Sequence, residues 1–335
     1  MYNKIRVVFF HRKPLPFHRS IEAIFKDVRN KIPTEITSLV HEFSCFSSGI
    51  LPRLRIIWEA YKNQGDVNHI TGDIHFAAIG LPQKNTILTI HDCNLLQESK
   101  GWKNQFLKYF WFTLPLKSCR YVTVVSEATK RELQKFVDYP SEQIIVIPNA
   151  ISEEYKYVPR IFNEDLPVIL QVGTTFNKNI ERLVEAIKDI PCQLNIVGIL
   201  SQDLIQHLEK NKIAYLNYTN LSQKEIVQQY IDCDIVSFVS TYEGFGMPII
   251  EANTTGRIVI TSNVSSMPEV AGNSAHLVNP YDVNAIQSGI LKIIQDKDYR
   301  ASLIENGLEN CKRFDAQNIA YKYAALYQKI AINHS

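Results

Sequence analysis

Short apolar runs alternate with amphipathic stretches along this chain, and the alternation predicts an α/β protein. Apolar runs of strand length lie at 5–10, 66–70, 86–90, 121–125, 168–172, 192–197, 213–216 and 235–240. Such runs, bounded by turn residues, are typical of strands buried on both faces of a parallel sheet. Helical periodicity follows at 20–30, 180–187, 283–295, 299–310 and 316–330. A polar stretch at 151–165 separates two such series, so we expect two Rossmann-like domains.

The composition is that of a globular protein without a disulfide framework. The chain has 335 residues, enough for two domains with a core each. Its six cysteines show no C-x-x-C spacing, which indicates reduced thiols, mostly buried, in a cytoplasmic protein. We expect no signal peptide, because the apolar start is soon followed by His-Arg-Lys, and no membrane-spanning run.

The charge is divided unevenly between the two halves. Residues 1–150 carry 20 Lys/Arg against 13 Asp/Glu, and residues 151–335 carry 16 against 21. The first half is therefore +7 and the second −5. A basic half suits an anionic membrane surface or an acidic acceptor. Nucleic acid is disfavoured, since no motif of a nucleic-acid-binding fold accompanies the charge.

Two segments of the basic half mix aromatic and cationic residues. They lie at 49–61 and 100–120. An interfacial helix at the inner face of a membrane has this composition. An amphipathic helix packed on its own sheet has it too, so the sequence leaves both interpretations open.

The stretch 238–256, FVSTYEGFGMPIIEANTTG, carries the clearest chemical pattern. A strand, a glycine-rich turn and a helix starting near Pro248 are predicted, because proline suits the first helical position. Glu243 lies in the turn and Glu251 one turn inside the helix. The helix start suits a phosphate, and the two acids suit sugar hydroxyls. A solvated helix with incidental acids is the alternative.

Two stretches of the second half resemble the donor-binding half of retaining GT-B glycosyltransferases of glycosyltransferase family 4. They are EGFGMPIIEA and the following GRIVITSNVSSMPEVAGNSAHLVNPYDVNAI. Val239 and Ile258 stand where that family has prolines, which affects local backbone shape only. The resemblance covers about residues 66–330. It implies a GT-B fold with two facing Rossmann-like domains. Residues 1–155 would bind the acceptor, residues 156–315 the nucleotide sugar, and a helix within 316–335 would cross back to the first domain.

The resemblance also implies the site residues. TIHD and VGTTFNKN resemble two further family patterns, which assign roles to His91 and Lys178 beside Glu243. Glu243 would hold hexose hydroxyls and Glu251 the ribose, while Lys178 would stabilise the leaving diphosphate. The donor-binding residues implied are Gly244, Phe245, Gly246, Met247, Glu251, Thr174, Asn177, Asn220 and Leu221. Thr174 and Asn177 occupy places where the family often has an arginine, which leaves the tightness of diphosphate binding open.

The acceptor side is less clearly marked. Asp92, His69 and Arg12 are its candidates, since polar residues at the carboxyl ends of parallel strands border ligand sites. The first loop lacks the glycine pair of many family members, and Arg12, Lys13, His18 and Arg19 would supply charge there, unless that loop is simply solvated. A core histidine is the alternative for His91. Asp232-Cys233-Asp234 imitates a metal motif of another fold, but we interpret it as a strand start.

The implied reaction is transfer of a hexose from a GDP- or UDP-linked sugar to an acceptor hydroxyl, with retention. The acceptor would be a glycan or lipid-linked saccharide in cell-surface polysaccharide assembly. We expect no cofactor and no metal. No second nucleophile is evident, which favours a route in which the leaving phosphate accepts the acceptor's proton. A nucleotide-sugar epimerase or hydrolase and a non-catalytic donor-binding subunit remain alternatives. The sequence determines neither the base, the hexose nor the acceptor.

Overall fold

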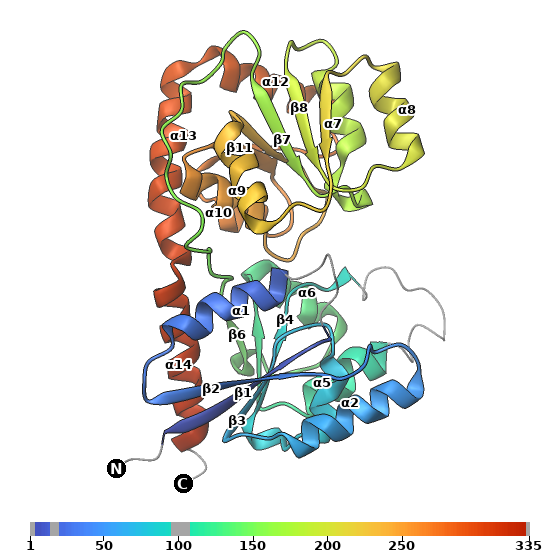
Figure 1. Ribbon diagram of the computed structural model, residues 1–335, viewed down its shortest axis with the longest axis vertical. Helices are drawn as coiled ribbons and strands as arrows, with labels where there is room; N and C mark the ends of the chain where they lie inside the picture. The colour runs from blue at the N-terminus through green and yellow to red at the C-terminus, as the bar shows by residue number, and fades with distance from the viewer. Residues whose placement is uncertain (1–3, 14–19, 95–107, 333–335) are drawn as a thin grey trace. The chain divides into compact units, whose positions relative to one another are not determined.

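The computed structural model describes residues 4–13, 20–94 and 108–332, which form two compact α/β units (Figure 1). The first unit comprises residues 1–150 and 316–335, and the second comprises residues 151–315. Helix α14 (Ala316–Ile332) therefore belongs to the first unit, as expected for the last helix of the chain.

The first unit is built on a parallel sheet whose described strands follow the order β2-β1-β3-β4-β5-β6. These strands are β1 (Ile5–His11), β2 (Ile36–Glu42), β3 (Val67–Ile70), β4 (Thr86–Ile90), β5 (Tyr121–Val124) and β6 (Ile144–Val146). The apolar runs predicted β1, β3, β4 and β5. Strand β2 was not predicted, because it lies at the sheet edge and its half-exposed residues form no continuous apolar run.

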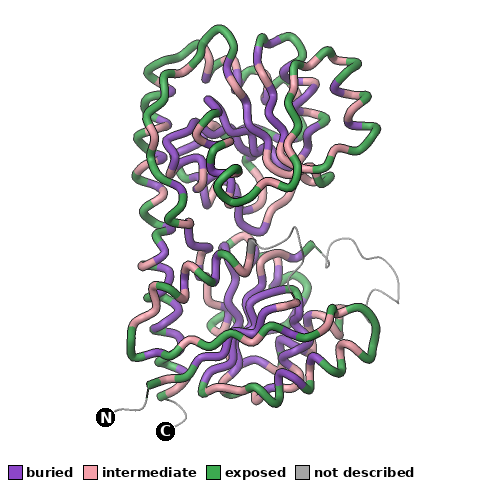
Figure 2. The backbone as a smooth tube through the Cα atoms, in the orientation of Figure 1, coloured by how far each residue is buried: buried purple, intermediate pink, exposed green. Residues whose placement is uncertain are grey.

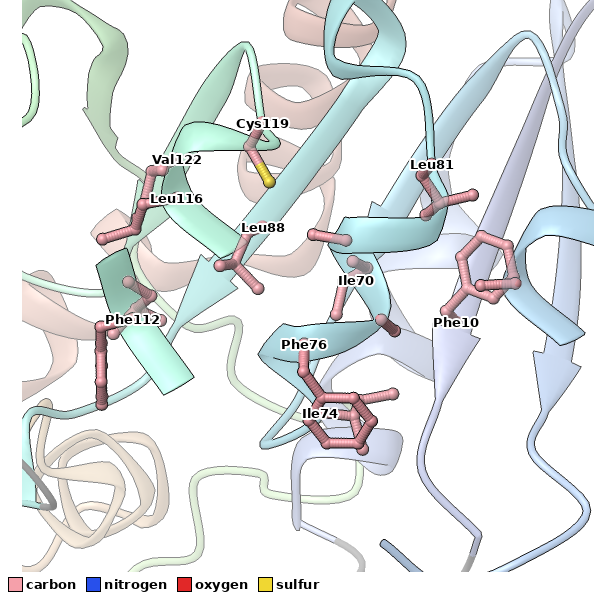
Figure 3. Close-up of a cluster of buried hydrophobic side chains, with 14 of the residues drawn as sticks. Phe10, Ile70, Ile74, Phe76, Leu81, Leu88, Phe112, Leu116, Cys119 and Val122 are labelled. Atoms are coloured by element: carbon pink, nitrogen blue, oxygen red, sulfur yellow. The ribbon is translucent and has the colours of Figure 1, made fainter. Parts of the chain in front are cut away.

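Helices cover the first sheet. They are α1 (Ser20–Lys31), α2 (Ile50–Lys62), η1 (His75–Gly80), η2 (Gln83–Asn85), the π-helical turn η3 (Tyr109–Thr113), α5 (Leu114–Lys117), α6 (Glu127–Phe136), η4 (Ser141–Gln143) and α14. Figure 3 shows a core cluster in which Phe10, Ile70 and Leu88 from the sheet meet Phe76 and Phe112. Of the aromatic segment at 100–120, residues 100–107 lie outside the described part of the chain, as do His18 and Arg19.

The second unit repeats the design, with described strands in the order β12-β11-β10-β7-β8-β9. They are β7 (Val168–Val172), β8 (Gln193–Val197), β9 (Tyr215–Tyr218), β10 (Ile235–Phe238), β11 (Ile258–Ser262) and β12 (Ala275–Val278). Its helical elements are η5 (Phe176–Lys178), α7 (Ile180–Ile187), α8 (Gln202–Lys210), α9 (Gln223–Asp232), α10 (Met247–Thr255), α11 (Met267–Ala271), α12 (Val283–Gln295), α13 (Lys297–Asn310) and η6 (Cys311–Phe314). Edge strand β9 begins two residues after the start of the predicted run. Its residues are only partly buried, so the apolar pattern does not define its ends.

Burial follows the layers in both units (Figure 2). The central strands are buried along their length, whereas the helices bury one side. Local polar groups define the helix starts. Ser126 accepts a hydrogen bond from the Thr129 amide at the start of α6, and Ser222 forms a capping box with Glu225 at α9. All six cysteines are free, and four of them are buried.

Candidate functional site

The predicted strand, glycine turn and helix are confirmed at 235–255. Strand β10 ends at Phe238, and α10 begins at Met247 with Pro248 in its first turn. Gly246 is the N-cap, with φ of 120°, a conformation that side chains disfavour. A Cβ at this position would lie only 3.2 Å from the Phe238 ring. Only glycine therefore fits between β10 and α10.

Two serines hold the backbone of this turn. The Ser265 hydroxyl donates to the Glu243 carbonyl oxygen at 2.6 Å. The buried Ser266 hydroxyl lies 2.6 Å from the Phe245 carbonyl oxygen and 2.9 Å from that of Glu243. Both serines belong to the SSMPEV loop, to which sequence analysis assigned no role. Their hydroxyls keep the turn in one conformation, so that Glu243 has a defined position.

Lys178 and Glu243 come together in the second unit. The Lys178 ammonium lies 2.7 Å from Glu243 Oε1, and Asn177 Nδ2 donates to the same oxygen at 3.1 Å. Both charged side chains are less than one-fifth exposed. The ammonium also lies 4.7 Å from the centroid of the Phe238 ring. Because an ammonium has three N–H donors, Lys178 can hold Glu243 and still offer a donor to a phosphate oxygen.

The loop after β7 brings Lys178 to this place. Gly173 has φ of 88°, and a Cβ there would lie 2.9 Å from Cε of Lys178, so the lysine stem needs a glycine beneath it. The Asn177 carbonyl oxygen accepts the Thr241 amide at 2.8 Å. Asn177 thus fastens the loop to the turn that carries Glu243. The Thr174 hydroxyl donates to the Ile199 carbonyl oxygen at 2.7 Å and braces the same loop.

Glu251 is held by two tyrosines that sequence analysis missed. The Tyr230 hydroxyl donates to Glu251 Oε2 at 2.5 Å, and the Tyr155 hydroxyl also bonds this carboxylate. The two rings meet edge to face, with centroids 5.5 Å apart. Burial raises the pKa of Glu251, which the tyrosine hydroxyls and the Lys178 charge oppose. No local pattern marks these tyrosines, because they come from α9 and from the segment before β7.

The remaining donor-side candidates surround α10 and α9. Gly244 and Phe245 are buried, and the Phe245 ring packs edge to face on Phe314 with centroids 5.5 Å apart. Asn220 is exposed, with φ of 56°, and Leu221 is half-buried. Both immediately precede the capping box of α9, which defines where their loop joins the helix.

His91 follows β4 in the first unit, as predicted. Its Nε2 lies 2.9 Å from the Thr71 carbonyl oxygen, so Nε2 carries the hydrogen and Nδ1 is left as an acceptor. Burial lowers the pKa of this ring. A neutral imidazole with an acceptor nitrogen suits a sugar hydroxyl better than a phosphate.

His11, which sequence analysis did not single out, is tied to the same strand ends. Arg29 can only donate, so its contact of 2.8 Å with Nε2 makes that nitrogen the acceptor. His11 Nδ1 then donates to the Thr71 hydroxyl at 3.0 Å. Burial, with the Arg29 charge, lowers the pKa of His11 to about 3.

The other acceptor-side candidates have different surroundings from those expected. His69 is fully buried, with Nδ1 at 2.7 Å from the Tyr327 hydroxyl and Nε2 at 2.6 Å from the Thr89 hydroxyl. The interpretation of His69 as a ligand contact is therefore wrong, because α14 covers it. Arg12 pairs with Glu22 and Asp73, each at 3.0 Å. Asp92 accepts the Asn94 amide at 3.0 Å.

Asp234 also has a structural role. It bonds Arg160 at 2.7 Å and accepts the Val168 amide at 2.8 Å, just before β10 begins. Across the described residues, no group of three or more His, Cys, Asp or Glu side chains is placed to hold a metal ion. Within the same ranges, every helix is too short or too polar to cross a membrane.

Comparison with known sequences agrees with this architecture. The family model described as "Glycosyltransferase Family 4" matches residues 4–155, and the one described as "Glycosyl transferases group 1" matches residues 156–310. The chain is 29% identical over 262 residues to the O-antigen chain mannosyltransferase B of Escherichia coli, covering 70% of this chain and 68% of that protein. It is 27% identical to the O-antigen chain mannosyltransferase RfbU of Salmonella typhimurium, over 64% of this chain and 62% of the relative.

Solved structures show the same fold. Anabaena HepE, crystallised with UDP and glucose, superposes with a TM-score of 0.78 over 97% of this chain and 100% of its own, at 17% identity. At that identity the likeness concerns the fold alone, and it confirms the predicted GT-B class with two Rossmann-like domains. The two family models adjoin without a gap, and the chain is a GT-B glycosyltransferase of the family 4 type.

Proposed function

We propose that this enzyme transfers a hexose from a nucleoside diphosphate sugar to a hydroxyl of a glycan or lipid-linked saccharide, with retention at the anomeric carbon. The observation that carries the proposal is the preformed cluster of Lys178, Asn177 and Glu243 beside the start of α10. A second carboxylate, Glu251, lies within α10 itself and is oriented by Tyr230 and Tyr155. Two oriented acids around one helix start match the two sugars and the diphosphate of a nucleotide sugar.

Each side chain has a proposed task in the reaction. Lys178 and the first turn of α10 would stabilise the charge that develops on the leaving diphosphate, which is worth about 3–4 kcal/mol per well-placed donor. Glu243 would accept hydroxyls of the transferred hexose, and Glu251 those of the ribose. His91 is proposed as a hydroxyl acceptor on the first unit. The leaving phosphate would take the proton of the acceptor hydroxyl, since no second nucleophile is assigned.

The names of the two relatives support mannose as the hexose and a cell-surface polysaccharide as the product. Both are O-antigen mannosyltransferases. The proposal leaves the nucleotide open between GDP and UDP.

A thermal-shift screen with GDP-mannose, UDP-glucose and the free nucleotides tests the donor. A donor at about 100 times its dissociation constant adds roughly 2.7 kcal/mol to the free energy of unfolding. Glu243→Gln and Glu251→Gln should lose the stabilisation, whereas Glu305→Gln, at an exposed position of α13, should keep it. NMR of the product from the stabilising donor then gives the anomeric configuration. Stabilisation by no nucleotide sugar, or an inverted product, contradicts the proposal.

A further inference from the structure

Two histidines of the first unit are joined through one residue, Thr71. His11 is the last residue of β1, and His91 directly follows β4. His91 Nε2 donates to the Thr71 carbonyl oxygen at 2.9 Å. The Thr71 hydroxyl lies 3.0 Å from Nδ1 of His11 and 3.1 Å from the Phe10 carbonyl oxygen. Thr71 is fully buried, so these protein groups alone determine its orientation and that of the carbonyl that holds His91.

Arg29 fixes the direction of the hydrogen bonds that lead to Thr71. A guanidinium has donors only, so Nε2 of His11, 2.8 Å from Arg29 Nη1, accepts. Nδ1 of His11 then donates to the Thr71 hydroxyl, whose own hydrogen goes to the Phe10 carbonyl oxygen. Burial and the Arg29 charge lower the pKa of His11 to about 3, so the ring is neutral near pH 7. An imidazolium would point a second N–H at the guanidinium, and the neutral ring avoids this clash.

Helix α1 holds both histidines from one side. Phe25 and Arg29 are four residues apart on α1, so they share one face of the helix. The Phe25 ring meets the His91 ring edge to face, with centroids 6.1 Å apart, and lies 6.4 Å from the centroid of the His11 ring. Phe25 is buried and belongs to the packed core. His91 is therefore confined by Phe25 and by its bond to Thr71.

We infer that His11 is a positioning residue: locked by Arg29, it holds Thr71 so that the hydrogen of His91 stays on Nε2 and Nδ1 remains the acceptor for a sugar hydroxyl. The hydrogen bond at one ring nitrogen of a histidine decides which tautomer is present. His11 is not itself a ligand contact, because the protein occupies both of its ring nitrogens. The inference rests on the proposed function in one respect, the contact of His91 with a sugar.

Two substitutions of His11 separate its two hydrogen bonds. The amide nitrogen of asparagine can take the place of Nδ1, so His11→Asn keeps the donor to Thr71 and loses the acceptor for Arg29. The amide oxygen of glutamine can take the place of Nε2, so His11→Gln keeps the acceptor for Arg29 and loses the donor to Thr71. Both variants place an amide in the same buried position, and denaturant unfolding compares their stability.

Nitrogen-15 NMR of labelled histidine side chains reports the tautomer of His91 without any substrate. The two ring nitrogens resonate far apart when one tautomer dominates, and they approach each other when two tautomers exchange. The Nε2–H tautomer should dominate in wild type and in His11→Asn, whereas His11→Gln should show exchange. The His91 signals are identified by their loss in His91→Ala. His69→Gln is the matched control, because the His69 nitrogens bond Tyr327 and Thr89 instead of Thr71. It should leave the His91 signals unchanged.

Thr71 offers a second pair of variants, which decides the matter if His11→Gln does not fold. Thr71→Val removes the hydroxyl that receives the His11 hydrogen and keeps the shape of the side chain. Thr71→Ser keeps the hydroxyl. His91 should exchange between tautomers in Thr71→Val and not in Thr71→Ser. A single fixed tautomer in Thr71→Val and His11→Gln would overturn the inference. Exchange in His11→Asn as well as in His11→Gln would reduce His11 to a structural residue.

Kinetics show whether the tautomer matters for the reaction. The measured rate is release of nucleoside diphosphate from GDP-mannose, or from UDP-glucose if that donor is the one that stabilises the protein. His11→Gln should lower it by about 10–100-fold, the range found when an outer hydrogen-bond partner of a metal-bound histidine is removed. His11→Asn should retain a rate close to that of wild type.

A double-variant cycle links the effect to His91. In a His91→Ala background, His11→Gln should lower the rate no further, because residues that act as a unit are not additive. Additive losses would overturn the positioning role of His11 and leave the proposed function intact. An unimpaired His91→Ala would instead contradict the sugar contact of His91 in the proposed function, and with it the part of the inference that depends on this contact.

Discussion

The polar residues at the carboxyl ends of the strands serve different purposes in the two units. In the second unit, the loops after β7 and β10 bring Lys178 and Asn177 onto Glu243, and the site is assembled from half-buried side chains. In the first unit, His69 at the end of β3 is bonded on both ring nitrogens and fully buried. The difference lies in what packs over the strand end: a glycine turn in one case, and α14 in the other.

The surroundings of an ionisable residue decide whether it can bind a ligand or is buried in the core. Glycines at 173 and 246 leave room for a lysine stem and for a helix start. Tyr327 and Tyr323 of α14 instead contribute aromatic rings that pack on His69. A buried group whose hydrogen bonds are all satisfied by the protein has none left for a ligand. Substitutions in the two regions should therefore affect different quantities.

The largest effect is expected from Lys178→Ala. The loss of its ammonium should lower kcat by about 10²–10³-fold, the range observed when one donor to a developing negative charge is removed. Lys188→Ala, which removes an exposed lysine that pairs with Glu185 near the end of α7, is the control and should leave kcat unchanged. Initial rates at saturating donor measure both. Equal rates for the two variants would show that Lys178 has no role in the reaction.

Tyr327→Phe should act on stability alone. It leaves Nδ1 of the buried His69 without its partner, which costs about 1–3 kcal/mol of unfolding free energy. The Michaelis constant for the donor should not change. Tyr321→Phe removes the hydroxyl of a tyrosine that is 56% exposed on the same helix, and should cost far less. Denaturant unfolding of both variants decides, and an unchanged midpoint for Tyr327→Phe would contradict the core role of His69.

Tyr230→Phe should act on the donor. Removing the hydroxyl that bonds Glu251 should raise the Michaelis constant about tenfold, or about 1.4 kcal/mol, with little change in kcat. Tyr281→Phe, an exposed tyrosine of the same unit, serves as control.

The pH dependence sharpens this test. Burial already raises the pKa of Glu251, and the tyrosine bonds favour its ionised form. Without Tyr230 the pKa rises further, so the carboxylate is lost at a higher pH as the solution is acidified. The acid limb of kcat/KM should therefore move to higher pH in Tyr230→Phe. If the acid limb of Tyr230→Phe lies at the same pH as that of the wild type, the Tyr230 hydroxyl does not affect the ionisation of Glu251.

Much of this protein was predictable because the information is local. Apolar runs identified β4 and β7 to the residue, since a strand buried on both faces consists mainly of apolar side chains. Gly246 and Pro248 marked the start of α10, because few other residues fit a positive φ followed by a helix start. Strand β2 was missed for the opposite reason, as an edge strand exposes side chains and hides its pattern.

The sequence by itself therefore determined the two strand–helix series, the glycine turn and the acids and lysine of the candidate donor site. Only the tertiary structure decided which polar residues stay available. His69 lies near the end of β3 and His91 directly after β4, yet the first is covered by Tyr327 and the second keeps an acceptor nitrogen. Tyr230 reaches Glu251, and Ser266 reaches the Glu243 turn, only through folding. Local patterns report which segments bury their side chains, whereas hydrogen-bond partners far apart in the chain are set when those segments pack.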